Sequence, residues 1–127
     1  MSTLLLVRHG LTEKTGPVLT GRAAGVDLDE RGRKQAAAVA ERIAALPVAA
    51  IVTSPLERCV DTAEYIRDAQ RQAGRDPDWQ VDERVVECGY GAWTGRPISP
   101  IAFSRYGRRS FSPSRRRVRE QPGFRAR

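Results

Sequence analysis

The chain has 127 residues, which is enough for one domain with a modest hydrophobic core but too few for two. It contains neither an apolar run of about 18 residues nor a signal-peptide pattern, so we expect a cytoplasmic protein that does not span a membrane. The net charge of +7 is unevenly distributed, because residues 96–127 hold ten arginines and a single acidic residue, whereas residues 1–95 are slightly acidic.

Near its N-terminus the chain has four consecutive aliphatic residues, 4–7, followed by Arg8, His9 and Gly10. Such a run is typical of a strand buried on both faces in a parallel sheet, and we predict a strand over residues 3–7. Ligands of open α/β sheets bind beyond the carboxyl ends of the strands, which places Arg8 and His9 at a predicted pocket. His9 is the only histidine of the chain. A lone histidine is more often a hydrogen-bonded structural residue than a catalytic one, so its neighbours must decide between the two interpretations.

Residues 11–28 show no sustained hydrophobic period and contain three glycines and a proline, which predicts a loop over the end of this strand. Arg22 and several threonines give the loop hydrogen-bond donors. A helix is predicted next, with Asp29 as its N-cap, apolar residues at helical spacing and Pro47 as its stop signal. A second strand is predicted over the apolar residues 49–53.

The tetrad Ser-Pro-Leu-Glu at residues 54–57 predicts the start of a second helix, with serine as the N-cap and glutamate completing a capping box. An apolar stripe at helical spacing follows, and Gly74 is expected to end the helix. Arg58 stands in the first turn of this helix, directly after a strand, so its side chain can reach the pocket of Arg8. From its position alone, a solvent-exposed arginine on the helix surface is an equally good interpretation.

A third strand is predicted over residues 79–86, and it delivers Glu87 to its carboxyl end. A glycine-rich turn over residues 89–95 follows. Taken alone, a glutamate in this position is most often an exposed surface residue. The two cysteines, Cys59 and Cys88, have neither the spacing of metal ligands nor that of a disulfide framework, so we expect reduced thiols, with Cys59 in the core.

The strand ends and the helix start bring four side chains to one edge of the predicted sheet: Arg8, His9, Arg58 and Glu87. Two guanidinium groups bind phosphate oxygens and remain charged at any working pH. A neutral imidazole can attack phosphorus and form a phosphohistidine, while a carboxylic acid can protonate the departing alkoxide and then activate water. This set suits phosphoryl transfer, and we expect neither a metal ion nor another cofactor, because the arginines supply the electrostatic stabilisation.

Four stretches of the chain resemble, in order and in residue type, the histidine phosphatase superfamily of phosphoglycerate mutase-like proteins. They are Leu-Val-Arg-His-Gly at 6–10 with Thr12, Leu-Thr-Gly-Arg at 19–22 with Leu-Asp-Glu-Arg-Gly at 28–32, Ser-Pro-Leu-Glu-Arg-Cys at 54–59 with Asp-Thr-Ala at 61–63, and Glu87 with Gly91, Trp93 and Gly95. The resemblance covers about residues 1–99. It implies an α/β three-layer sandwich with a mostly parallel sheet, present here as an N-terminal portion.

The resemblance also implies a role for each candidate residue. His9 is implied as the nucleophile, Arg8 and Arg58 as phosphate ligands. Arg22 is implied at the rim of the phosphate site and Glu87 as the proton donor. The implied activity is hydrolysis of a small phosphorylated substrate through a phosphohistidine.

Two features depart from the pattern of this family. Thr15 stands where many mutases have asparagine, which weakens a mutase assignment but leaves phosphoglycerate mutase-type phosphotransfer as an alternative. The second pocket histidine that the resemblance implies has no counterpart in a chain with one histidine, so we expect impaired catalysis.

Residues 100–127 are rich in arginine and show neither a helical nor a strand period, so we expect a separate, disordered tail. Arginines in such a tail contact nucleic acid or other polyanions without selectivity. A non-catalytic remnant with a polyanion-binding tail is therefore the alternative to an enzyme. The oligomeric state is not predicted by the sequence.

Overall fold

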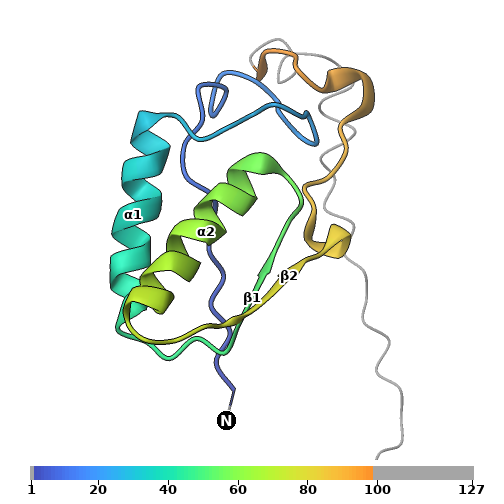
Figure 1. The fold of residues 1–127 in the computed structure, drawn as a ribbon. Helices are drawn as coiled ribbons and strands as arrows, with labels where there is room; N and C mark the ends of the chain where they lie inside the picture. Colours follow the sequence, from blue (N-terminus) through green and yellow to red (C-terminus); the bar gives the residue numbers. More distant parts are fainter. Residues whose placement is uncertain (1, 99–127) are drawn as a thin grey trace, which may run out of the picture.

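A computed structural model describes residues 2–98 of the chain (Figure 1). The elements follow in the order α1 (Glu30–Ala44), β1 (Ala50–Thr53), α2 (Glu57–Gln72) and β2 (Asp78–Val81). β1 and β2 pair in parallel, with Ile51 opposite Trp79, and α2 forms the crossover between them. α1 and α2 lie side by side, and α2 also packs against β1. This arrangement confirms the predicted α/β class with a parallel sheet.

The hydrophobic core lies between the two helices and β1. Its buried residues are Ala40, Ile51, Ala63 and Ile66. The two alanines are small enough to let α1 and α2 approach each other closely, while the isoleucines fill the space towards the sheet. Because α2 packs against both α1 and β1, its first turn is held at the carboxyl end of β1, where the predicted site begins.

α1 has the predicted N-terminus. The side chain of Asp29 is the N-cap, and its Oδ1 accepts a hydrogen bond from the backbone N–H of Gly32 at 2.8 Å. The helix ends at Ala44, ahead of the stop signal at Pro47.

The fully buried side chain of Gln70 on α2 satisfies the C-terminal end of α1. Its Nε2 donates to the carbonyl oxygens of Ile43 and Leu46, at 2.9 and 3.0 Å. Its Oε1 accepts from Nε of Arg75 at 2.6 Å. These bonds replace those that water makes at an exposed helix end, so α1 and α2 are joined by hydrogen bonds as well as by packing.

Replacing Gln70 with leucine is expected to lower the free energy of unfolding by about 1–3 kcal/mol, because it removes the side-chain partner of the Leu46 carbonyl oxygen and of the Arg75 Nε–H and one of the donors to the Ile43 carbonyl. Urea unfolding of Gln70→Leu and of the wild type measures the loss. The matched control is Gln72→Leu at an exposed position on the same helix, where we expect a change within about 0.5 kcal/mol. Equal losses in the two variants would contradict this role of Gln70.

The predicted strand over residues 3–7 is wrong for this structure. No strand is assigned there, and no backbone hydrogen bond joins these residues to the rest of the described chain. Leu4 and Leu6 are 80% and 89% exposed. The apolar pattern indicates burial on both faces, but a strand also needs a neighbouring backbone, and none of the described segments supplies one. The run is therefore an unpaired apolar segment (dark blue in Figure 1).

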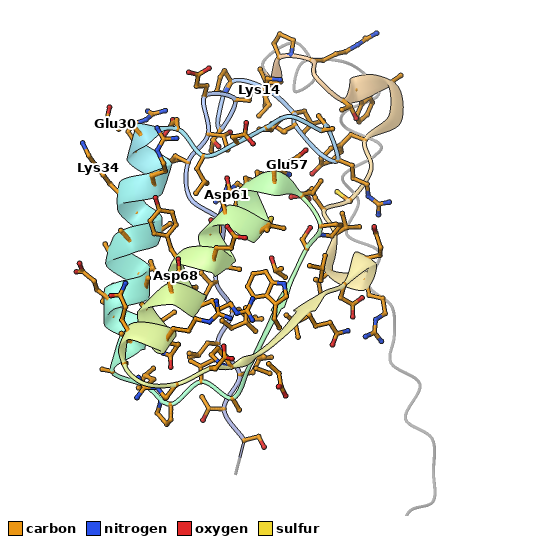
Figure 2. The ribbon with its side chains drawn as sticks, in the orientation of Figure 1. Lys14, Glu30, Lys34, Glu57, Asp61 and Asp68 are labelled. Atoms are coloured by element: carbon orange, nitrogen blue, oxygen red, sulfur yellow. The ribbon has the colours of Figure 1, made fainter. Side chains whose placement is uncertain are left out.

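α2 starts later than predicted and has no capping box. It begins at Glu57 with Leu56 as the N-cap residue and without a side-chain cap. The Ser54 hydroxyl accepts from the N–H of Leu56 at 3.3 Å. The Glu57 carboxylate, at the end of α2 that faces the loop (Figure 2), accepts instead from the N–H of Gly25 at 3.0 Å. The tetrad thus ties the helix start to the loop over residues 11–28.

The C-terminal end of α2 agrees with the sequence-based prediction, whereas β2 ends earlier than predicted. α2 ends at Gln72, and Gly74 follows with a φ of +77°, a left-handed conformation that favours glycine. β2 spans Asp78–Val81 and is shorter than predicted. It ends because the Asp82 side chain accepts from the N–H of Arg84 at 2.9 Å and caps a 3₁₀ turn.

Three further expectations concern the tail, the membrane and the cysteines. The expected disordered tail over residues 100–127, with its polyanion binding, lies outside the described residues. Within residues 2–98, no helix is long and apolar enough to cross a membrane. Both cysteines are free, but Cys59 is half-buried and not in the core, while Cys88 is exposed.

Candidate active site

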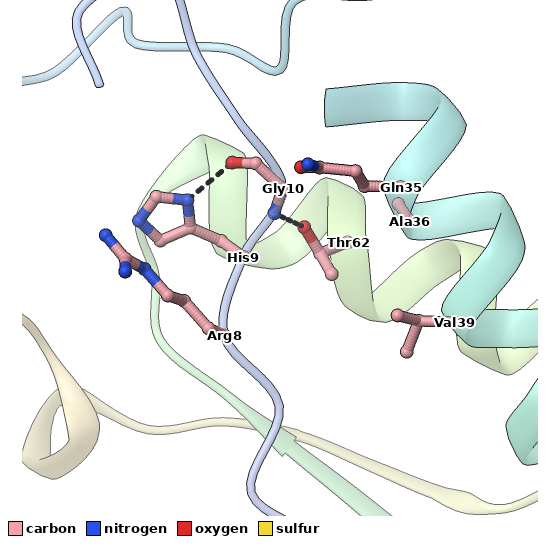
Figure 3. A pocket seen from close by; sticks show the side chains of 7 residues that line it. All are labelled: Arg8, His9, Gly10, Gln35, Ala36, Val39 and Thr62. Carbon is pink, nitrogen blue, oxygen red and sulfur yellow. Dashed lines mark hydrogen bonds between the residues drawn. The ribbon is translucent and has the colours of Figure 1, made fainter. Parts of the chain in front are cut away.

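His9 follows the N-terminal apolar run and is half-buried. Its Nδ1 lies 2.7 Å from the carbonyl oxygen of Gly10 (Figure 3), and its Nε2 accepts from Nε–H of Arg58 at 3.2 Å. Because a carbonyl only accepts hydrogen bonds, this contact assigns the imidazole proton to Nδ1, and Nε2 keeps its lone pair. The nitrogen that faces Arg58 is thus the one with nucleophilic character.

Arg58 stands in the first turn of α2 and is 2% exposed, so the structure decides against a solvent-facing side chain. Besides the bond to His9, its Nη2 donates to the carbonyl oxygen of Gly21 at 2.8 Å. Its Nη1 has no hydrogen-bond partner within residues 2–98. A buried guanidinium nitrogen without an acceptor is unfavourable, so this position favours an anion that accepts from Nη1.

A cavity of about 210 Å³ opens beside His9. The residues that line it come from the N-terminal segment, α1 and α2 (Figure 3): Arg8, His9, Gly10, Gln35, Ala36, Val39 and Thr62. The exposed side chain of Arg8 extends alongside the imidazole in this view. Arg8 and Arg58 therefore place two positive charges next to the His9 ring.

Glu87 follows β2 and the 3₁₀ turn after it. Its exposed carboxylate accepts from the backbone N–H of Cys88 at 3.2 Å. Arg22, in the loop, donates from Nε to the carbonyl oxygen of Glu87 at 2.6 Å, which fastens this segment to the loop. The Glu87 charge raises the pKa of His9, so the carboxylate lies in the electrostatic neighbourhood of the imidazole. The structure thus brings all five predicted site residues into one region.

Gly21 lies where the loop, α2 and the segment after Glu87 meet. Its φ of +52° favours glycine, and a Cβ atom at this position would lie 2.6 Å from Cδ2 of Tyr90. Its carbonyl oxygen accepts from Arg58, as described above. A side chain at Gly21 would therefore disturb both the Tyr90 contact and the support of Arg58.

Burial is the main cause that lowers the pKa of His9 from its ordinary value of 6.5. The hydrogen bond to Gly10 raises this pKa, and the charges of Arg58 and Arg8 lower it. A pKa below 6.5 means that the imidazole is neutral at neutral pH and stays neutral in more acidic solution than a free histidine. The neutral form is the one that can act as a nucleophile.

The His9 imidazole is accordingly expected to titrate below pH 6.5, and Arg58→Met is expected to raise the midpoint. The substitution removes a positive charge and the donor to Nε2, both of which favour the neutral ring. Because His9 is the only histidine, its NMR signal reports the titration directly. Arg71→Met, at an exposed position in the last turn of α2, is the control and should leave the midpoint unchanged. A wild-type midpoint at or above 6.5 would contradict this account.

Two side chains that sequence reasoning left without a role also contribute to the site. The Thr62 hydroxyl accepts from the N–H of Gly10 at 3.1 Å, and Oε1 of Gln35 accepts from the N–H of Leu11 at 3.1 Å. The position of Thr62 one helical turn after Arg58 is the signal in the sequence that points to the first contact. Among the residues that the structure describes, no group of three His, Cys, Asp or Glu side chains is arranged to hold a metal ion.

Comparison with known proteins extends these observations. The family model described as histidine phosphatase superfamily (branch 1) matches residues 4–123. Phosphoserine phosphatase 1 of Hydrogenobacter thermophilus is 34% identical over 104 residues, which cover 80% of this chain and 46% of that protein. The 2,3-bisphosphoglycerate-dependent phosphoglycerate mutase of Thermoplasma acidophilum is 29% identical over 107 residues, which cover 84% of this chain and 51% of the mutase.

A solved structure shows the same likeness in three dimensions. The native mycobacterial glucosyl-3-phosphoglycerate phosphatase superposes on this chain with a TM-score of 0.67 at 32% identity. The match covers 80% of this chain and 46% of the phosphatase chain. The chain thus spans about half the length of the relatives it matches.

Proposed function

The chain belongs to the histidine phosphatase superfamily (branch 1), and on this premise we propose that its site hydrolyses small phosphomonoesters through a phosphohistidine on His9. The observation that carries the proposal is the pair formed by His9 and Arg58. An imidazole protonated on Nδ1 faces a buried guanidinium whose Nη1 has no partner within the described residues. Two matched relatives are phosphatases by name, which supports hydrolysis as the reaction class.

In the first proposed step, a phosphate dianion binds between Arg8 and Arg58 and accepts hydrogen bonds from both guanidinium groups. Nε–H of Arg58 turns from His9 to a phosphate oxygen and frees the lone pair of Nε2. Nε2 then attacks phosphorus, the bond from phosphorus to the ester oxygen breaks, and Glu87 donates its proton to that oxygen. The hydrogen bond from Nδ1 to Gly10 keeps the ring oriented during the attack.

In the second proposed step, the Glu87 carboxylate takes a proton from water, and the water oxygen attacks phosphorus. The bond between phosphorus and Nε2 breaks, and its electron pair returns to the imidazole. Inorganic phosphate leaves, with His9 neutral and Glu87 protonated again. Arg8 and Arg58 offset the charge on the phosphoryl oxygens in both steps, while Arg22 keeps Glu87 in place.

Phosphoglycerate mutase-type transfer is the second candidate, and the match to the Thermoplasma mutase favours it. In this reaction, the phosphohistidine passes its phosphoryl group to a hydroxyl of a second molecule and not to water. Thr15, which stands where many mutases have asparagine, is part of a turn of the loop: its hydroxyl accepts from the N–H of Thr12 at 3.0 Å. The ratio of phosphoryl transfer to an added hydroxy acid and to water separates the two candidates.

Trapping of the covalent intermediate tests the proposal. A phosphomonoester with a radioactive phosphoryl group is mixed with the protein, and the reaction is stopped in base, where a phosphohistidine survives. We expect label on the wild type that is stable in base and lost in acid, and no label on His9→Ala. Because His9 is the only histidine, such a label can be assigned to it. Equal label on both proteins, or hydrolysis without label on the wild type, would overturn the proposal.

A further inference from the structure

Thr62 lies on α2 one turn after Arg58 and is buried. Its hydroxyl donates to the carbonyl oxygen of Arg58 at 2.8 Å and accepts from the N–H of Gly10 at 3.1 Å (Figure 3). A hydroxyl has one proton and two lone pairs, so both bonds form at the same time. None of the proposed reaction steps uses this residue.

Gly10 is confined from the opposite side by α1. A Cβ atom on Gly10 would collide with the backbone of Gly32, and a Cβ atom on Gly32 would collide with the carbonyl of Leu11. Gln35 of α1 also accepts from the N–H of Leu11. The backbone of residues 10 and 11 is therefore held between the two helices, with Thr62 as its contact on α2.

The position of Gly10 determines where the His9 ring points, because the Gly10 carbonyl accepts from Nδ1 at 2.7 Å. The segment before His9 gives little support, since residues 3–7 make no backbone hydrogen bond to the rest of the described chain. The orientation of the ring thus depends on the contacts that follow it. Thr62 makes one of these contacts from the same helix that carries Arg58.

We propose that Thr62 is a positioning residue of this site: by holding the Gly10 peptide to α2, it keeps Nε2 of His9 directed at the guanidinium of Arg58. The effect of Thr62 on phosphate binding rests on the proposed function. Its effect on the orientation of the His9 ring depends only on the fold. α2 then carries both the buried phosphate ligand and the group that aligns the nucleophile with it.

Two substitutions distinguish the effect of the Thr62 hydroxyl from the effect of the side-chain volume. Thr62→Val removes the hydroxyl at nearly constant volume, and Thr62→Ser keeps it. Nitrogen NMR of the single histidine reports the fraction of rings protonated on Nδ1. We expect Thr62→Val to lower this fraction and to move the His9 titration towards 6.5, while Thr62→Ser resembles the wild type. Thr53→Val, which removes a buried hydroxyl bonded to the Ser54 carbonyl, is the control and should change neither quantity.

Binding of vanadate, an analogue of phosphate, is a second readout. We expect it to be about tenfold weaker in Thr62→Val, the effect of roughly one hydrogen bond, and unchanged in Thr62→Ser. A wild type that does not bind vanadate would count against the proposed function, while the imidazole measurements would still test Thr62. An unchanged Nδ1 fraction and titration in a folded Thr62→Val would overturn the positioning role.

Hydrogen exchange in the wild type tests the same contact without a substitution. The Gly10 amide is expected to be protected to the same degree as amides inside α2, because it donates to a buried hydroxyl. Exchange as fast as that of residues 4–7, which have no backbone partner in the described part of the chain, would overturn the proposal.

Discussion

Replacing Glu87 with glutamine is expected to slow the hydrolysis of alkyl phosphates by about 10²–10⁴-fold. An alkoxide is a poor leaving group, so the proposed first step needs a proton from Glu87 when the ester bond breaks. A nitrophenolate leaves without protonation, and an aryl ester should therefore lose far less. The Glu87 charge acts on the imidazole, because it raises the pKa of His9, and Arg22 holds the Glu87 backbone.

The measurement is kcat/KM for one alkyl and one nitrophenyl phosphate, since this ratio covers the steps up to formation of the phosphohistidine. The later attack of water, in which Glu87 is proposed as the base, then does not enter the comparison. Glu83→Gln is the matched control, because Glu83 is an exposed glutamate in the turn before Glu87. Equal slowing of both esters by Glu87→Gln would show that Glu87 only shapes the site.

The sequence predicts that His9 and Arg58 lie close together, and they do, although they are 49 positions apart and the strand predicted before His9 is absent. His9 follows an aliphatic run and Arg8, and Arg58 stands in the first turn of the helix after β1. The burial of Arg58 is not predictable in this way, since a residue at that position faces a pocket or solvent equally well. The carbonyl of Gly21 decides it, and this contact joins residues 37 positions apart through a loop without hydrophobic period.

Two of the wrong predictions have a common physical origin. A strand over residues 3–7 agrees with the local pattern but needs a neighbouring backbone, and the capping box needs the Glu57 carboxylate for the helix end. In the structure that carboxylate bonds to Gly25 instead. The N-cap at Asp29, by contrast, is a contact over three residues and is predicted correctly. The Asp29 cap lies within the local pattern, whereas the strand and the capping box depend on what the tertiary structure places beside residues 3–7 and Glu57.

The 127-residue chain is expected to hydrolyse an aryl phosphate at least about 100-fold more slowly than the mycobacterial glucosyl-3-phosphoglycerate phosphatase, at the same pH. In the proposed site, Arg8 and Arg58 bind the phosphoryl oxygens, and the only imidazole of the chain is the nucleophile. The family resemblance implies a second histidine as a further donor to these oxygens. Loss of one such donor commonly costs about 3–4 kcal/mol, or roughly 10²–10³-fold in rate.

A second cause acts in the same direction. Arg8 and His9 follow a segment without backbone partners in the described part of the chain, so their alignment with Arg58 rests on the contacts of Gly10. Looser alignment slows the attack on phosphorus, because the reacting atoms spend less time at the required distance. The decisive measurement is kcat/KM of the chain, of His9→Ala and of the complete relative with one nitrophenyl phosphate. A rate within tenfold of the relative that disappears in His9→Ala would mean that Arg8 and Arg58 bind the transition state well enough without a second imidazole.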